Sequence, residues 1–134
     1  MDLYTDGAFS PSRNQGGWCY YLPELHLCSC GSEQNTTNNR MELTAVIKAL
    51  ELLVKVDVKQ IKLFSDSMYV LGGMFLNWSK ASNNDLWEVL IQLMNKLSSQ
   101  QKELVYEHIN GHIGIKGNEL VDTLAVKMSQ NGNS

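Results

Sequence analysis

TTNNRMELTAVIKALELLVK, residues 36–55, predicts an amphipathic helix that carries one misplaced charge. The helix is expected from Arg40 to about Val54, and the polar residues before it favour a helix N-terminus. Apolar residues recur at helical spacing opposite a polar face. The apolar stripe consists of Val46, Ala49, Leu50 and Leu53, with Leu43 and Leu52 on its flanks. The polar face consists of Thr44, Lys48, Glu51 and Lys55. Glu42 lies in the middle of the stripe, where a lone carboxylate is unfavourable unless it is paired or bound to metal. The pattern therefore predicts a core-facing helix and a functional role for Glu42.

Three strands are expected before this helix. The first covers residues 1 to about 9 and contains Asp6 directly before Gly7. The second and third are expected at residues 18–22 and 25–30, where apolar and aromatic residues lie between glycine and proline turn signals. This spacing is typical of a three-stranded antiparallel meander.

The segment after the helix predicts a fourth strand and more helix. Residues 60–65 (QIKLFS) alternate as a strand that ends in Asp66, on the same face as Phe64. Residues 67–78 have a helical pattern that Gly72 and Gly73 are expected to interrupt. A further helix is expected to start at Asn83 or Asn84, with one apolar face made of Leu86, Leu90, Leu93 and Leu97.

A fifth strand and a last helix complete the pattern. The strand is expected at residues 104–109, and a glycine-rich loop, NGHIGIKGN (110–118), leads into the helix. Asp122 lies on the flank of that helix, whose expected buried stripe is Leu120, Val121, Leu124, Ala125 and Met128. The order of elements predicts an α/β fold, a mixed sheet with helices on its faces.

Length and composition predict one domain over residues 1–128 and a disordered tail over 129–134. No apolar run approaches the ~18 residues of a membrane span, and the N-terminus lacks a basic and apolar leader. Cys19, Cys28 and Cys30 are odd in number and lack C-x-x-C spacing, so we expect three reduced packing residues in a cytoplasmic protein.

The formal charge of −3 does not favour a nucleic-acid partner, because phosphate binding is usually driven by lysine and arginine. Metal ions bound by Asp6, Glu42, Asp66 and Asp122 would change this balance. Ten acids would then remain against eleven bases, which leaves the rest of the surface close to neutral at +1. The sequence thus permits a nucleic-acid substrate but predicts only weak electrostatic attraction between the protein and the phosphates.

Four ordered segments resemble the ribonuclease H type 1 family: YTDGAFS (4–10), TTNNRMEL (36–43), FSDSMYV (64–70) and HINGHIGIKGNELVD (108–122). The similarity runs from Asp6 to Ala125, which is nearly the whole chain. It implies the ribonuclease H-like fold, a five-stranded sheet whose central strands carry Asp6 and Asp66. It also implies hydrolysis of the RNA strand of RNA–DNA hybrids, leaving 5′-phosphate and 3′-hydroxyl ends.

The resemblance implies a two-metal site. Two divalent ions about 4 Å apart activate water and stabilise the departing oxygen, and hard carboxylate ligands select Mg²⁺, with Mn²⁺ as a substitute. By motif position, Asp6 would bridge both ions and Asp122 would help hold the ion that activates water. Glu42 and Asp66 would hold the other ion.

Further residues match the family by position. His112 corresponds to a mobile histidine that takes a proton or helps product release, and Asn118 also fits the pattern. The expected substrate-binding residues are Thr37, Asn38, Asn39, Asn118, Ser12 and Asn14. A hydroxyl and amides at a helix N-terminus suit a DNA phosphate. Three departures weaken the expected binding of the hybrid. Met68 replaces a common glutamine, and residues 79–84 (SKASNN) leave no room for a basic protrusion. The loop after Asp6 lacks the asparagine of the bacterial enzymes: Ser12 stands at that position, and Asn14 is a nearby substitute.

Other interpretations stay open at this point. Asp6 and Asp66 could cap turns, Asp122 could complement a helix dipole, residues 37–39 could form only a helix cap, and His112 could be an ordinary loop residue. Trp78 either packs or stacks on a sugar, whereas His26 and His108 are read as strand residues. We expect a monomer, with any accessory protein unknown. One alternative is a domain of a larger reverse transcriptase or mobile-element machine, although the initial Met1 and the lack of linker sequence argue against it. The other alternative is a non-catalytic module that binds the hybrid.

Overall fold

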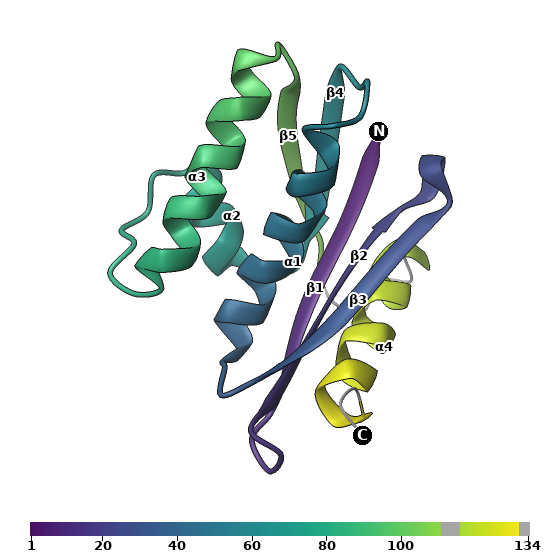
Figure 1. Ribbon diagram of the computed structural model, residues 1–134, viewed down its shortest axis with the longest axis vertical. Helices are drawn as coiled ribbons and strands as arrows, with labels where there is room; N and C mark the ends of the chain where they lie inside the picture. Colours follow the sequence, from purple (N-terminus) through teal and green to yellow (C-terminus); the bar gives the residue numbers. More distant parts are fainter. Residues whose placement is uncertain (111–115, 132–134) are drawn as a thin grey trace.

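A five-stranded mixed sheet forms the centre of the protein in a computed structural model that describes residues 1–110 and 116–131 (Figure 1). The strand order is β3-β2-β1-β4-β5, with β1–β2 and β2–β3 antiparallel and β1–β4 and β4–β5 parallel. The strands are β1 (Asp2–Ser10), β2 (Gln15–Leu22), β3 (Leu27–Gln34), β4 (Gln60–Ser65) and β5 (Glu103–His108). The predicted α/β fold with a five-stranded mixed sheet is confirmed.

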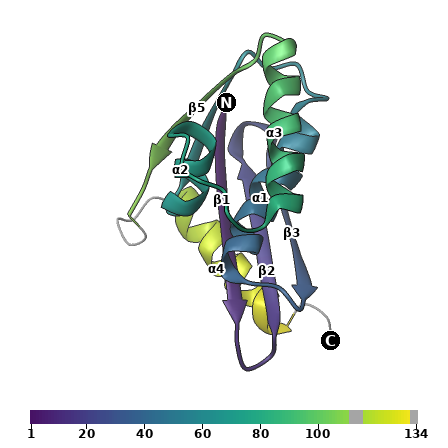
Figure 2. The same ribbon diagram turned by 90° about the vertical axis from the view of Figure 1, so that its left-hand side faces the viewer.

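Helices cover both faces of the sheet (Figures 1 and 2). On one face lie α1 (Asn38–Leu53), α2 (Met68–Phe75) and α3 (Asn84–Ser99), which share one hydrophobic core with the sheet. On the other face lies α4 (Lys116–Asn131), which packs on β1 and β2. No helix within residues 1–110 and 116–131 has the length and apolar character needed to cross a bilayer.

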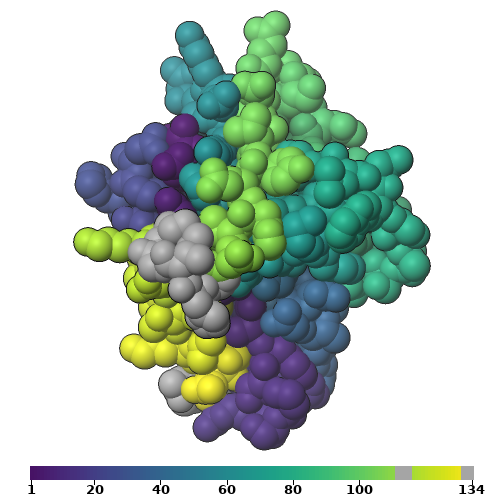
Figure 3. Space-filling model, turned by 180° about the vertical axis from the view of Figure 1, so that it is seen from behind, coloured from purple at the N-terminus to yellow at the C-terminus, as the bar shows by residue number. Residues whose placement is uncertain are grey.

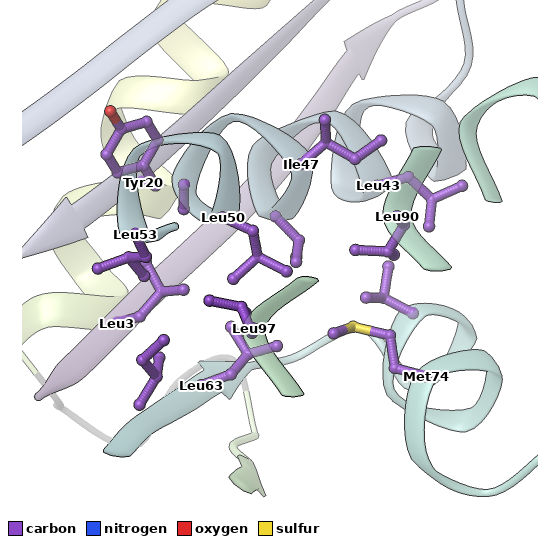
Figure 4. Packing of buried hydrophobic residues seen from close by; sticks show 14 of the residues in the cluster. Leu3, Tyr20, Leu43, Ile47, Leu50, Leu53, Leu63, Met74, Leu90 and Leu97 are labelled. Atoms are coloured by element: carbon purple, nitrogen blue, oxygen red, sulfur yellow. The ribbon is translucent and has the colours of Figure 1, made fainter. Parts of the chain in front are cut away.

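The larger core lies between the sheet and α1 (Figure 4). Leu3 of β1 and Leu63 of β4 are fully buried there against the apolar stripe of α1 and against Leu97 of α3. The predicted stripe of α1 is confirmed, but Thr44, expected on the polar face, is buried. The Thr44 hydroxyl donates a hydrogen bond to the carbonyl of Arg40 (2.7 Å), so its burial leaves no unpaired donor.

A smaller core joins α4 to the opposite face. Val121 and Ala125 of α4 bury Cys19 of β2. Leu120 was expected in the buried stripe, but 37% of its surface is exposed because the helix contacts the sheet through Val121 and Ala125 instead. Ser129 is helical and buried, so the predicted tail boundary falls inside α4, which ends at Asn131. The expectation of a single domain stays a prediction.

Two predicted boundaries differ because of packing and turn geometry. Gly72 and Gly73 do not interrupt α2; a side chain at either position would collide with the ring of Trp78 or Trp87, so the glycines let these indoles pack on the helix. Trp78 therefore packs on α2, and 47% of its surface remains exposed. The third strand starts later than expected because Pro23–Leu25 forms a 3₁₀ turn that ends at His26, which has a left-handed φ of 49°.

The cysteine prediction is wrong for one pair. Cys19 and Cys30 are directly opposed on β2 and β3, and the structure joins them in a disulfide, which leaves Cys28 as the free thiol. The spacing of the cysteines did not reveal this pairing, because the register between two strands depends on the intervening turn.

Candidate active site

Two of the candidate carboxylates lie on, or directly after, neighbouring central strands. Tyr4 of β1 pairs with Phe64 of the parallel strand β4, and Asp6 and Asp66 each follow two residues later. Side chains two residues apart on a strand share a face, so Asp6 projects on the side where Tyr4 and Phe64 stack, and Asp66 follows directly after the end of β4. The parallel register between β1 and β4 therefore brings together two residues that are sixty positions apart.

Glu42 reaches this pair from α1, and Gly7 makes the approach possible. An added Cβ at Gly7 would collide with the backbone of Met41 and Glu42. Only a residue without a side chain allows α1 to lie this close to β1. As a result, carboxylate oxygens of Asp6, Glu42 and Asp66 all lie within 4.8 Å of one another.

These three carboxylates are crowded, and two of them are almost completely buried. Asp6 is 3% exposed and Glu42 is 6% exposed, and within the described part of the chain no lysine or arginine forms an ion pair with either. Burial, followed by the charge of Asp66, raises the pKa of Asp6 to about 8, although the Gly7 N–H donates to its Oδ1 at 2.9 Å and opposes the shift. Burial and the charge of Asp6 likewise raise the pKa of Glu42 well above its usual value.

The cluster has the composition and burial of a cation-binding site. Oε1 of Glu42 is buried and has no hydrogen-bond partner among the described residues. Buried carboxylates of this kind are stable when they are paired or coordinate a metal. Hard oxygen donors this close together suit a small divalent cation, so the residues present fit the metal site expected from the sequence.

Asp122 lies beside the cluster without being part of its tightest group. It is exposed on α4, and after burial and the charge of Asp66, a hydrogen bond with the Asp122 side chain further raises the pKa of Asp6. The start of α4 is held over β1 because Gly117 lies against the ring of Tyr4. The structure thus brings Asp6, Glu42 and Asp66 together and places Asp122 next to Asp6.

Hydroxyl groups on both sides of Asp66 shape the turn that presents it, and these residues were missed in the sequence. Ser65 Oγ accepts from the Ser67 N–H (3.0 Å), and Ser67 Oγ caps α2 by accepting from the Val70 N–H (3.2 Å). Nε2 of His108, a strand residue as expected, lies 3.3 Å from the Asp66 carbonyl oxygen. The Ser-Asp-Ser sequence directly before a helical segment was the available signal.

The expected substrate-binding residues of the first half of the chain gather at one end of the sheet. Thr37 is the N-cap of α1, with Oγ1 accepting from the Arg40 N–H at 3.2 Å, and the exposed Asn38 and Asn39 follow it. Thr37 therefore makes its capping contact, and the side-chain amides of Asn38 and Asn39 remain exposed to solvent. Ser12 and Asn14 are exposed in the β1–β2 turn.

Hydrogen bonds connect that turn to the start of α1. Asn14 Nδ2 donates to Asn35 Oδ1 (2.6 Å), and the Asn35 N–H donates to the Asn14 carbonyl (3.0 Å). Arg40, which the sequence did not single out, binds both carboxylate oxygens of Asp85 at 3.0 and 2.7 Å and Asn83 Oδ1 at 3.2 Å. This contact anchors the first turn of α1 to the start of α3.

The two remaining candidates belong to the segment before and within α4. Asn118 was expected in a loop but lies in the first turn of α4, 2% exposed, and its Oδ1 has no partner among the described residues. His112 lies outside the described residues, so its assignment rests on the sequence motif.

Comparison with known proteins agrees with this geometry. A family model for RNase H matches residues 1–130. The chain belongs to the ribonuclease H family. It is 38% identical over 138 residues to the ribonuclease H of Ruthia magnifica, covering 92% of this chain and 90% of the relative. It is 41% identical over 140 residues to that of Orientia tsutsugamushi (93% and 79% covered) and 37% identical over 150 residues to that of Rhodopirellula baltica (97% and 90% covered). The predicted ribonuclease H activity on RNA–DNA hybrids and the metal-dependent nuclease class are confirmed.

Proposed function

We propose that this ribonuclease H cleaves the RNA strand of hybrids at a site where Asp6, Glu42, Asp66 and Asp122 hold two divalent cations. The observation that carries the proposal is the convergence of three carboxylates within 4.8 Å, two of them buried, from strand β1, helix α1 and the residue that follows β4. Bound cations would activate the attacking water and stabilise the departing 3′ oxygen. Mg²⁺ is the proposed ion because all four side chains offer hard oxygen atoms, with Mn²⁺ as a substitute.

The side chains have separate tasks in this proposal. Asp6 lies between Glu42 and Asp122, so its carboxylate can contribute to both cations. Asp66 would bind the same cation as Glu42. In the metal-free protein the raised pKa of Asp6, about 8, keeps a proton in the cluster at neutral pH. Cations must displace this proton, so their affinity rises as pH increases toward 8.

Substrate contacts are proposed at the end of the sheet where α1 begins. Thr37 and Asn39 present a hydroxyl and an amide beside the free N–H groups of a helix N-terminus, which attract a phosphate. Asn38, Ser12 and Asn14 are exposed beside them, and Asn118 is proposed to contact substrate from α4. The hybrid is recognised through its shape and 2′-hydroxyls.

Two of the three departures from the family pattern lie in and after α2, and they predict weak binding of the hybrid. Met68, the first residue of α2, offers no amide where many members of the type 1 family carry glutamine. The connection between α2 and α3 is short and contains one lysine, Lys80. An accessory protein or a higher metal concentration would offset this loss. Monomeric state and cytoplasmic location stay predictions.

A panel of labelled substrates tests the proposed function. RNA–DNA hybrid, duplex RNA, duplex DNA and both single strands are incubated with the full chain, with and without Mg²⁺, and the product ends are mapped. We expect cleavage of only the RNA in the hybrid, only with metal, leaving 5′-phosphate ends. Binding of the hybrid without cleavage under any metal condition would instead favour the non-catalytic module.

His112→Ala is expected to slow turnover by roughly 10²-fold, because it removes a group that accepts or delivers a proton. Metal affinity should be unchanged, since the carboxylates are intact. His26→Asn is the matched control: His26 lies in the β2–β3 turn at a left-handed φ of 49°, which asparagine tolerates. Equal single-turnover and steady-state rates for His112→Ala and wild type would remove His112 from the mechanism.

A further inference from the structure

All three cysteines of the chain lie on one face of the β2–β3 hairpin. Cys19 of β2 is directly opposite Cys30 of β3, and Cys28 lies two residues before Cys30 on the same face. This is the face covered by α4, since Cys19 packs against Val121 and Ala125. Figure 3 views the molecule from behind, with α4 in yellow, and α4 also contacts β3.

The sulfur atoms are close enough to share one ion. They all lie within 4.8 Å of one another, and Sγ of Cys19 is 3.6 Å from Sγ of Cys28. Two thiolates bound to one tetrahedral zinc ion at ~2.3 Å would be separated by about 3.8 Å. The sulfur atoms of Cys19 and Cys28 therefore already have the spacing of two thiolates on one metal ion, and Cys30, two residues from Cys28, becomes a third ligand once its disulfide with Cys19 is reduced.

We propose that the reduced Cys19, Cys28 and Cys30 form a second metal site, which binds one thiophilic d¹⁰ cation such as Zn²⁺ or Cd²⁺. Soft sulfur ligands select such cations, whereas the carboxylate cluster selects hard Mg²⁺. Cys28 is exposed, so the fourth coordination position is open to water on its side. The missing C-x-x-C motif is no obstacle, because strand pairing brings the ligands together.

The disulfide and the metal-bound state exclude each other. When Cys19 and Cys30 are joined, only Cys28 remains as a thiol, and one thiolate does not make a site. Reduction by a phosphine opens the site: the disulfide gains two electrons and two protons, and the phosphine becomes its oxide with oxygen from water. Metal occupancy should therefore appear only after reduction.

The site also lies next to the catalytic strand. Cys19 is the cross-strand partner of Asp6, and both side chains project toward α4. A metal bound across β2 and β3 would fix the surface on which Val121 and Ala125 of α4 pack, and Asp122 directly follows Val121. The two sites remain chemically separate because one offers sulfur and the other oxygen.

Titration of the reduced full-length protein with Cd²⁺ tests the proposal. The phosphine is removed under argon, Mg²⁺ is added in large excess to occupy the carboxylates, and sulfur-to-cadmium charge-transfer absorption is recorded in the ultraviolet. We expect absorption that saturates at one Cd²⁺ per chain, with the protein monomeric by size-exclusion chromatography, and no band without reduction.

Cys28→Ser is the decisive variant, because its exposed position spares the fold. It should weaken Cd²⁺ binding by at least the roughly 10- to 100-fold that loss of an outer-shell partner costs. Ser29→Ala, the neighbour on the opposite face of β3, should titrate as wild type. Absence of the band, a metal bridging two chains, or equal affinity in Cys28→Ser would overturn the proposal.

Discussion

Asp6→Asn should abolish RNA cleavage while the fold remains intact. The amide keeps the shape of the side chain and its hydrogen bond from the Gly7 N–H, but it removes the charge at the centre of the site. Loss of several kcal/mol of transition-state stabilisation corresponds to a rate reduction on the order of 10³-fold or more. The measurement is single-turnover cleavage of a labelled hybrid at saturating Mg²⁺, with circular dichroism as a check on folding.

Asp57→Asn is the matched control for this variant. Asp57 is exposed in the turn between α1 and β4, so its substitution changes the net charge equally and leaves the carboxylate cluster untouched. It should cleave at the wild-type rate. Wild-type activity of Asp6→Asn would remove the basis for the proposed site.

Asp6→Asn should also be more stable than wild type at high pH when no metal is present. The pKa of Asp6 is raised in the folded state from 3.8 to about 8, so the folded protein binds more protons than the unfolded chain between these values. Wild-type stability is therefore greatest at or below pH ~4 as far as this group is concerned, and it falls as pH rises through 8. Asp6→Asn removes that loss.

The expected gain for Asp6→Asn is about 1–3 kcal/mol at pH 9, because Glu42 and Asp66 still repel each other. Urea unfolding in EDTA from pH 5 to pH 9 measures it, and Mg²⁺ should narrow the difference by stabilising the wild type. If the free energy of unfolding changed with pH in the same way for both proteins, charge repulsion within the carboxylate cluster could not be what destabilises the metal-free wild type.

Sequence periodicity placed the candidate carboxylates correctly wherever their position depended on a single element. Glu42 was found because one helical turn before Val46 is a core position, and Asp66 because the alternation of β4 ends there. Asp122 was correctly placed on a helix flank. These positions follow from the periodicity of a single helix or strand, which consecutive residues reveal.

Features that depend on register between elements could not be predicted in this way. The opposition of Cys19 and Cys30 requires the exact pairing of β2 with β3, which a 3₁₀ turn shifts. The burial of Thr44 and the contact of Arg40 with Asp85 depend on how α3 lies along α1. Gly7 was visible beside Asp6, but its role appeared only when α1 was seen against β1.

Gly7→Ala should therefore impair the site from a position that carries no functional group. The added methyl group would collide with backbone atoms of Met41 and Glu42, which cannot rotate away as a side chain can. Overpacking of this kind costs about 1–3 kcal/mol. Moving α1 away from β1 also withdraws Glu42 from Asp6, and a displacement near 1 Å can reduce turnover by roughly 10²-fold. Urea unfolding, Mn²⁺ calorimetry without substrate, and hybrid cleavage measure the three effects.

Gly31→Ala separates this mechanism from a general intolerance of strand glycines. Its added methyl group would meet the indole of Trp18, a partly exposed side chain that is free to shift, and neither residue belongs to the carboxylate cluster. Gly7 has no left-handed φ, so alanine is not excluded there by backbone conformation, and any defect must come from the contact with α1. We expect Gly31→Ala to lose some stability but to keep wild-type Mn²⁺ affinity, whereas Gly7→Ala should lose both. If Gly7→Ala bound Mn²⁺ and cleaved hybrid as wild type does, the close approach of α1 to β1 could not be what positions Glu42.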